Sequence, residues 1–322
     1  HLSIRRQRQM CIRDSFGTTF TAAGLPSKQG LSAYGAFNYT DRGSYYGGGG
    51  RVLSPTDTLT ATDILAINAY GNSEDYSFVT GTEFSISEWF KNFTFQTGAE
   101  ARGSSVTDKM PGYGRSIKQQ AITYGAFVQG IYFRGSAFTV TGGLRFDLPT
   151  VKGVYDYSDT VLNNGLKLYP VVVPRLTMMY RPTSDLSLRA TFAQGYRAPQ
   201  AFDEDLHIET VGGAARFINL STNLRTERSN SFTLSADQFL LKRDWQINLI
   251  AEGFFTQLNN PFINSNAEEL ANGISIVTKR NGTGSRVYGV NLELNAQKNN
   301  NILQSGITPV SYTHLRAHET VL

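Results

Sequence analysis

Apolar and polar residues alternate along much of the chain with a period of two. One side of segment 245–256 consists of Trp245, Ile247, Leu249, Ala251, Gly253 and Phe255. Polar residues occupy most of the other side, with Ile250 as the exception. The same alternation recurs in 93–102, 137–147, 186–192 and 287–297. Successive side chains of a strand point to opposite faces, so each segment is predicted to be a β-strand with one apolar and one polar face.

The predicted strands are long, and the segments that connect them alternate in length. Many strands run for about ten residues or more, whereas a strand of a globular protein has roughly five or six. About ten residues, tilted near 45°, cross a bilayer. Short turns are expected at 88–91, 134–136, 183–185, 241–244 and 298–301. Long polar or glycine-rich connections are expected at about 42–75, 107–119, 149–168, 198–226 and 259–284. Short turns at one end and long loops at the other are typical of an outer-membrane β-barrel.

Aromatic residues fall near the predicted strand ends, where a membrane barrel carries its interfacial girdles. They include Trp89, Phe90, Tyr132, Phe133, Tyr180 and Trp245. A soluble antiparallel sandwich or propeller would show the same alternation. The charged polar faces, the strand lengths and the alternating connections favour the membrane barrel. No apolar run approaches the 18 or more residues of a transmembrane helix, which excludes a helical membrane protein.

The two ends resemble translated sequencing-adapter sequence. Residues 5–15 read RRQRQMCIRDS and residues 310–320 read VSYTHLRAHET, and both match reading frames of transposase-type adapters. We therefore predict that 1–15 and 310–322 are adapter-derived and that 16–309 is the native part. The alternative for the first end is a basic targeting arm.

Composition argues against an enzyme, a metal centre and a nucleic-acid partner. The predicted native part carries 25 Lys and Arg against 24 Asp and Glu, so it is almost neutral. The single cysteine, Cys11, lies in the first end, and His207 is the one histidine left. There is no GxSxG motif to accompany His207. We expect no cofactor, catalytic residue or His/Cys metal site. Acidic residues at 203–209 would suit a calcium ion chemically, but their spacing favours a solvated loop.

A family resemblance rests on segment 175–206, RLTMMYRPTSDLSLRATFAQGYRAPQAFDEDL. This segment resembles the barrel of TonB-dependent outer-membrane receptors. There, a strand ends in Tyr-x-Pro and is followed by a short turn, a strand with LxLRA and then GxRAPxxxE. The matching residues here are Arg175, Tyr180, Pro182, Arg189, Gly195, Arg197, Ala198, Pro199 and Glu204. Segment 223–232, with Glu227 and Ser229, is similar to the family's NLxPExS strand start, but Thr226 stands where proline is usual. Segment 281–294 is similar to a later strand, with Asn291 in place of a frequent Glu. Two loops, 44–50 and 110–116, resemble those of receptors from Bacteroidota.

The resemblance implies an all-β fold, an antiparallel transmembrane β-barrel of 22 strands that encloses a plug. About thirteen strands are expected here, so this would be an incomplete barrel that lacks the plug and the C-terminal strands. Inward-facing charges are expected to hold the plug or to pair across the wall, namely Arg145, Asp147, Arg189, Glu252 and Glu293.

The implied function is energised uptake of a large, scarce ligand such as a ferric siderophore, cobalamin, haem or a glycan. The implied partners are the TonB–ExbB–ExbD complex, acting through the missing plug, the lipids of a Gram-negative outer membrane, and a surface lipoprotein. Candidate ligand contacts are the loop residues Tyr45, Tyr46, Tyr113, Arg115, Arg197, His207 and Arg216. The alternatives are a plug-less porin or adhesin of the outer membrane and a soluble carbohydrate-binding β-protein.

Overall fold

The computed structural model describes residues 9–25, 28–45, 54–61, 63–64, 68, 70–157, 160–166, 169–199, 216–265, 268–269 and 275–314. Fourteen strands form one large sheet in which every pairing is antiparallel. They are β1 (Gln9–Leu25), β2 (Gln29–Tyr45), β3 (Tyr70–Phe90), β4 (Phe93–Met110), β5 (Arg115–Arg134), β6 (Phe138–Tyr157), β7 (Thr160–Leu166), β8 (Val171–Tyr180), β9 (Leu186–Arg197), β11 (Glu227–Lys242), β12 (Trp245–Asn259), β16 (Ser285–Lys298), β17 (Asn301–Ile307) and β18 (Val310–His314).

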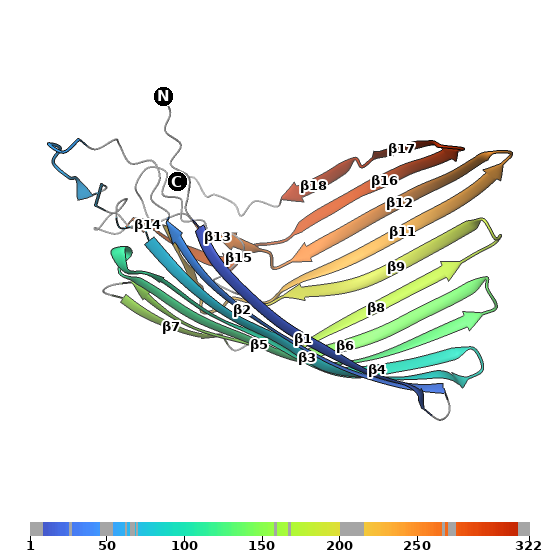
Figure 1. Ribbon diagram of the computed structural model, residues 1–322, viewed down its shortest axis with the longest axis horizontal. Coiled ribbons are helices and arrows are strands. Elements are labelled where there is room, and N and C mark those ends of the chain that lie inside the picture. The colour runs from blue at the N-terminus through green and yellow to red at the C-terminus, as the bar shows by residue number, and fades with distance from the viewer. Residues whose placement is uncertain are drawn as a thin grey trace.

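The sheet is curved and open (Figure 1). Its strands follow the order β1-β2-β3-β4-β5-β6-β8-β9-β11-β12-β16-β17, with β7 beside β6 and β18 beside β16. The two strands that end this order, β1 and β17, do not pair with each other in the described part of the chain. The predicted fold class is therefore confirmed as an antiparallel all-β sheet, and its open form is consistent with part of a barrel.

A second, small sheet lies at the end of the large sheet where the long connections are (Figure 1). It consists of β10 (Arg216–Leu220), β13 (Phe262–Asn264), β14 (Glu268–Glu269) and β15 (Ser275–Asn281). Strands β10 and β15 pair in parallel, although one comes from the connection before β11 and the other from the connection after β12. The small sheet therefore ties together two connections that are far apart in sequence.

The short turns gather at one end of the sheet and most long connections at the other (Figure 1), as predicted. The connections expected at 107–119 and at 149–168 are exceptions, since β6 runs to Tyr157 and β7 spans Thr160–Leu166. Strand β4 continues to Met110 and β5 begins at Arg115, so only four residues separate them, three of which form the short 3₁₀ helix Pro111–Tyr113. Gly114 closes this turn at a φ of 56°, a left-handed conformation that glycine adopts without strain. The prediction was wrong because a strand that has left the membrane is polar on both faces and resembles a loop.

The strands extend well beyond the thickness of a bilayer. Strand β3 has 21 residues, and β5 and β6 have 20 each. At about 3.3 Å per residue, a strand of this length spans roughly 65 Å. A tilt of about 40° leaves roughly 50 Å along the membrane normal, about twice the ~25 Å apolar band of an outer-membrane barrel. The half that carries the long connections therefore projects from the apolar band.

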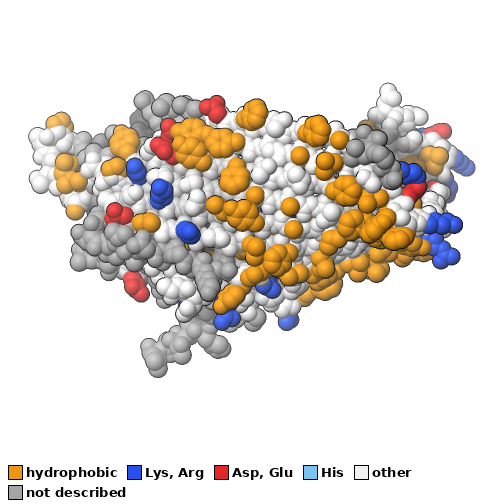
Figure 2. All heavy atoms as spheres, turned by 90° about the horizontal axis from the view of Figure 1, so that it is seen from below, with side chains coloured by type: hydrophobic (Ala, Val, Ile, Leu, Met, Phe, Trp, Pro, Cys, Tyr) orange, Lys and Arg blue, Asp and Glu red, His pale blue; other side chains and the backbone are white. Residues whose placement is uncertain are grey.

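The apolar face of the sheet is the exposed one. Leu144, Phe146 and Leu148 alternate along β6, and each is at least 43% exposed. Figure 2 shows apolar side chains spread over the underside of the sheet, with Lys and Arg toward both ends and along one edge. A large exposed apolar surface of this kind is stable against lipid rather than against water.

The strands also include residues that the sequence pattern assigns to adapter. Strand β1 begins at Gln9 and pairs with β2 from there onward, and β18 spans Val310–His314 against β16. Backbone hydrogen bonds of a sheet edge accept almost any sequence, so this pairing does not decide where these residues come from. The adapter origin stays a prediction.

Candidate functional site

A row of residues crosses five neighbouring strands on the concave face of the sheet. Tyr34 of β2 is the register partner of Gly81, which is the partner of Glu100 on β4. Glu100 is in turn the partner of Gly125 on β5, and Gly125 is the partner of Asp147 on β6. Register partners point to the same face of a sheet, so the three polar side chains and the two glycines share one face.

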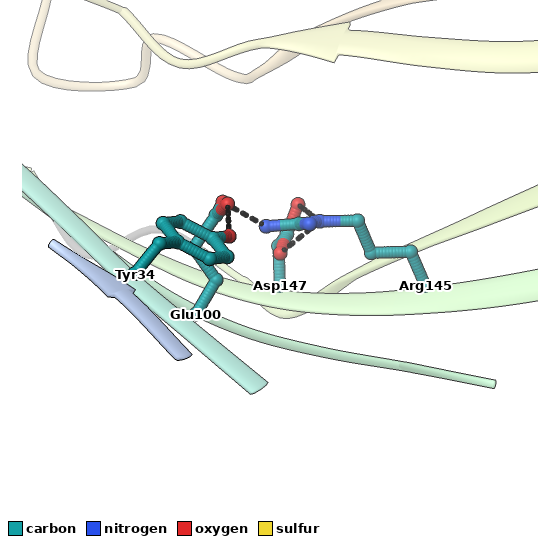
Figure 3. A network of polar contacts seen from close by, with 4 residues as sticks. All are labelled: Tyr34, Glu100, Arg145 and Asp147. Carbon is teal, nitrogen blue, oxygen red and sulfur yellow. Dashed lines mark hydrogen bonds and ion pairs between the residues drawn. The ribbon is translucent and has the colours of Figure 1, made fainter. Parts of the chain in front are cut away.

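The polar members of the row form one network with Arg145 (Figure 3). The Tyr34 hydroxyl donates to Glu100 Oε2 at 2.6 Å. Arg145 Nη2 donates to Glu100 Oε1 at 2.8 Å, and its Nε contacts both oxygens of Asp147 at 2.8 and 3.0 Å. The Asp147 side chain is 1% exposed, whereas that of Arg145 is 27% exposed. One guanidinium therefore bridges two carboxylates across three strands, with charge-assisted hydrogen bonds of the strong kind.

The two glycines make this network possible. A Cβ at Gly81 would lie 2.6 Å from Tyr34 Oη and 2.7 Å from Tyr34 Cζ. A Cβ at Gly125 would lie against Asp147 Oδ1 and 2.5 Å from Arg145 Nη2. Each glycine thus leaves room for a long side chain from the neighbouring strand to lie flat over it and reach Glu100 (Figure 3). Tyr34 lies over Gly81, and Arg145 lies over Gly125. Sequence reasoning expected Arg145 and Asp147 to face inward, but it missed Tyr34, Glu100 and the two glycines, because a glycine in a strand shows its use only once its neighbours are known.

The network lies on the face opposite to Leu144 and Phe146, since successive residues of β6 alternate. Arg145 therefore pairs across the wall with Glu100 of β4, as expected, whereas Asp147 pairs with Arg145 of its own strand. Glu293 accepts a hydrogen bond from Asn291 Nδ2 at 2.8 Å on the same strand. The expectation that these charges hold a plug stays a prediction.

A buried ion pair lies farther along β4, beyond the apolar band. Arg115 Nη2 contacts Asp108 Oδ2 at 2.9 Å, and Arg115 Nη1 lies 3.2 Å from the sulfur of Met110. The two charged side chains are 2% and 7% exposed. Burial raises the pKa of the Asp108 carboxyl above its ordinary 3.8, and the nearby Arg115 and Arg42 offset this only in part. Arg115 therefore joins the ends of β4 and β5, and its expected contact with a ligand stays a prediction.

A second cluster joins β9, β11 and β13. Arg197 Nε lies 3.1 Å from Glu227 Oε1, and Arg197 Nη2 donates to Oε2 at 3.3 Å. The backbone N–H of Phe262 donates to the same Oε2 at 3.0 Å. The Arg197 guanidinium lies 4.9 Å from the centroid of the Phe262 ring, a cation–π distance. The Arg197 side chain is still 50% exposed, so this cluster presents a cation and an aromatic ring to the surroundings.

The structure brings together several residues of the family pattern. Arg197 and Glu227 are register partners, and so are Gly195 and Ser229, where a Cβ on the glycine would lie 2.8 Å from the serine Oγ. Arg175, Tyr180 and Arg189 lie in β8 and β9, Pro182 lies in the turn between them, and Ala198 and Pro199 follow β9. Glu204 lies outside the described residues.

The other candidate ligand contacts are only partly placed. The backbone of Tyr45 ends β2, that of Tyr113 lies in the 3₁₀ turn, and that of Arg216 begins β10. Tyr46 and His207 lie outside the described residues. The backbone positions fall at the end of the sheet with the long connections, and ligand contact by these residues stays a prediction.

The residues that the structure describes contain no group of three or more His, Cys, Asp or Glu side chains placed to hold a metal ion. No helix among them is long and apolar enough to cross a membrane.

Solved structures with the same fold are outer-membrane receptors and transporters. The FrpB iron transporter of Neisseria meningitidis (F3-3 variant) superposes with a TM-score of 0.66 at 13% identity, over 93% of this chain and 43% of its own. The alcaligin outer-membrane receptor FauA of Bordetella pertussis gives 0.64 at 13% identity, over 95% and 47%. A double mutant of the Serratia marcescens receptor HasR, in complex with its hemophore HasA and heme, gives 0.64 at 13%, over 92% and 47%. The chain thus spans less than half the length of these proteins.

Sequence comparison gives the family directly. No curated protein matches the chain. A family model described as "TonB dependent receptor-like, beta-barrel" matches residues 8–321, almost the entire chain. The family and the structural neighbours are transport receptors and not enzymes. The chain belongs to the TonB-dependent receptor-like β-barrel family.

Proposed function

We propose that this chain forms part of the wall of an outer-membrane receptor that takes up a large, scarce ligand. Proteins of the family reside in the outer membrane of Gram-negative bacteria and act with TonB. The observation that carries the proposal is the division of the sheet into two faces. Its outer face is apolar and exposed, and its inner face holds charges that are paired across the strands. A wall of this kind suits lipid on one side and a hydrated or plug-filled interior on the other.

The ligand would meet the end of the wall that projects beyond the apolar band. Arg197 and Phe262 are the described residues best suited to contact it, because a half-exposed guanidinium beside a ring binds anionic and aromatic groups. Ferric siderophores and haem have such groups, and the relatives named above include an iron transporter, an alcaligin receptor and a receptor in complex with heme. A ferric siderophore or haem is therefore our first choice, with cobalamin and glycans as the alternatives.

The energy would come from the inner membrane. We infer that the TonB–ExbB–ExbD complex acts on a plug domain within the barrel, and that a surface lipoprotein assists at the outer end. No step breaks a covalent bond, so the barrel residues bind, orient and exclude, and they need no cofactor.

Uptake in a defined host tests the proposal. The full-length gene that contains this chain is expressed in a Gram-negative strain without its own siderophore and haem receptors, with and without tonB. We expect accumulation of a labelled ferric siderophore or of haem that requires tonB. Uptake that is unchanged without tonB would instead support the plug-less porin.

A matched pair of variants tests the binding cluster. Arg197→Gln should weaken binding of the transported ligand about tenfold, because it removes one charge-assisted contact worth about 1.5 kcal/mol or more. Arg243→Gln changes an arginine of the short turn at the opposite end and should leave binding unaltered. Heat-modifiable mobility in detergent checks that both variants fold. Equal affinity of the two variants would remove Arg197 from the site.

A further inference from the structure

A basic pocket lies where the connection before β11 meets the end of β12. It has a volume of about 650 Å³. Its described lining includes Tyr169, Asn223, Arg225, Arg228 and Asn260, and none of the described lining residues is acidic. Two arginines without an acidic neighbour in the lining favour an anionic group, and the fork of donors on each guanidinium fits phosphate.

The amide of Asn281 holds the walls of this pocket together. Its Oδ1 accepts from the backbone N–H of Arg225 at 2.7 Å, and its Nδ2 donates to the carbonyl of the same residue at 3.0 Å. The same Nδ2 also donates to the carbonyl of Asn260 at 2.9 Å. Because Asn281 fixes both connections, the backbone of the pocket is set before any ligand arrives.

An apolar groove crosses the outer face of the same strands. It has a volume of about 840 Å³ and is lined by side chains that include Leu176, Phe232, Leu234 and Tyr288. Pro309, Val310 and Ser311 border it beside β16, and Val310 and Ser311 fall in the segment predicted to be adapter-derived. We therefore define the groove by the residues of β8, β9, β11, β12 and β16 alone. Gly253 lies within it, and a Cβ added there would meet no atom within 4 Å. The missing side chain of Gly253 therefore keeps the groove open.

The pocket and the groove lie in one line along β11. The pairing of β11 with β9 and β12 is regular from Arg228 to Leu234, so alternate residues over this stretch share a face. Arg228 therefore points to the same side as Asn230, Phe232 and Leu234. It precedes Phe232 by four residues, or about 13 Å along the strand. Between Arg228 and Phe232, Gln194 Nε2 donates to Asn230 Oδ1 at 2.8 Å. This hydrogen-bonded pair lies between the pocket and the groove.

We infer that this line of residues binds one membrane lipid with a phosphorylated headgroup. The phosphate binds in the pocket between Arg225 and Arg228, and an acyl chain lies in the groove over Gly253. The basic pocket is complementary to an anionic headgroup, and the apolar groove is complementary to an acyl chain. The groove lies in the apolar band and the pocket lies toward the projecting end of the sheet, which is the order of the two parts of a lipid in a membrane. The inference rests on the proposed membrane location and is independent of the transported ligand.

Lipid binding to the purified protein tests this inference. The delipidated full-length protein, in micelles of a non-ionic detergent, is titrated with diphosphorylated lipid A, with its dephosphorylated form and with inorganic phosphate. We expect the phosphorylated lipid to bind at least tenfold more tightly than either of the other two. Equal affinity for the phosphorylated and dephosphorylated lipids would overturn the inference, and so would equal affinity for free phosphate.

Two independent variants locate the lipid, each with a matched control. Arg225→Gln with Arg228→Gln should weaken binding at least tenfold, and Arg243→Gln should not. Gly253→Leu fills the groove and should weaken binding about fivefold or more. Its control, Gly35→Leu, adds the same side chain to the outer face of β2, where a Cβ makes only an ordinary contact at 3.8 Å. Unchanged affinity in either test variant would overturn the inference, whereas loss of TonB-dependent uptake with lipid binding intact would bear on the proposed function alone.

Discussion

Replacing Gly125 by alanine should break the network on the inner face of the sheet. The added Cβ would occupy the space of the Arg145 guanidinium and of Asp147 Oδ1. Neither group has an equivalent place to go, because Asp147 is 1% exposed and Arg145 lies flat over β5 to reach Glu100. The substitution therefore pushes the guanidinium away from both carboxylates.

The expected cost follows from the bonds that are lost. A hydrogen bond to a charged group contributes about 1.5–3 kcal/mol, and a buried carboxylate left without its partner costs at least as much. Because Arg145 and Glu100 are partly exposed, water can replace some of the lost hydrogen bonds. We therefore expect Gly125→Ala to lower the free energy of unfolding by about 2–4 kcal/mol. At a strand position where the new methyl group fits, the same change raises stability by about 0.4–1 kcal/mol. The sign of the effect is therefore diagnostic.

Urea unfolding of the full-length protein in phospholipid vesicles, followed by tryptophan fluorescence, measures this effect. Gly253→Ala is the matched control, because a Cβ there meets no atom within 4 Å. In a background with Arg145→Ala and Asp147→Ala, the cost of Gly125→Ala should disappear. The reasoning would be refuted if Gly125→Ala still lowered the free energy of unfolding in that background. It would also be refuted if Gly125→Ala stabilised the otherwise wild-type protein.

Two further predictions concern groups on the inner face. Tyr34→Phe keeps the ring over Gly81 but removes the donor to Glu100, and should lower the free energy of unfolding by about 1–2 kcal/mol in the same urea assay; no change would mean that water replaces the hydroxyl. Because burial raises the pKa of Asp108, the folded state takes up a proton at a higher pH than the unfolded chain. The resulting stabilisation is complete below the ordinary value of 3.8 and is lost as the pH rises through the folded-state pKa. The free energy of unfolding, measured from pH 3.5 to 7, should therefore contain a contribution that falls with rising pH in the wild type and is absent in Asp108→Asn. Identical pH profiles of the two proteins would contradict this prediction.

The strands and their two faces were predictable because the membrane imposes a strict pattern on them. Every residue of β6 between Phe138 and Leu148 faces either lipid or the interior, so alternation is strong there. Beyond the apolar band both faces meet water and the pattern fades. The stretch 107–119 therefore resembled a loop, although most of it is strand.

The inner network was not predictable because it depends on register. Tyr34 and Glu100 are 66 residues apart, and nothing in their local sequence relates them. Gly81 and Gly125 gain their role only when each is placed between two long side chains. The family resemblance was more informative, because two of its motifs contain Arg197 and Glu227, which form an ion pair in the structure. It gave no sign of their contact with Phe262 or of the pocket that Arg225 and Arg228 line.

The most direct test of a barrel wall is the environment of alternate residues on β6. Single cysteines at Thr139, Val140, Thr141 and Leu144, in a background free of other cysteines, carry a nitroxide spin label in lipid vesicles. Collisions with oxygen report lipid, and collisions with a water-soluble nickel chelate report the interior. We predict that Val140 and Leu144 collide mainly with oxygen, and that Thr139 and Thr141 collide mainly with the chelate. Equal access of the chelate to all four positions would mean a soluble sheet and would contradict the account.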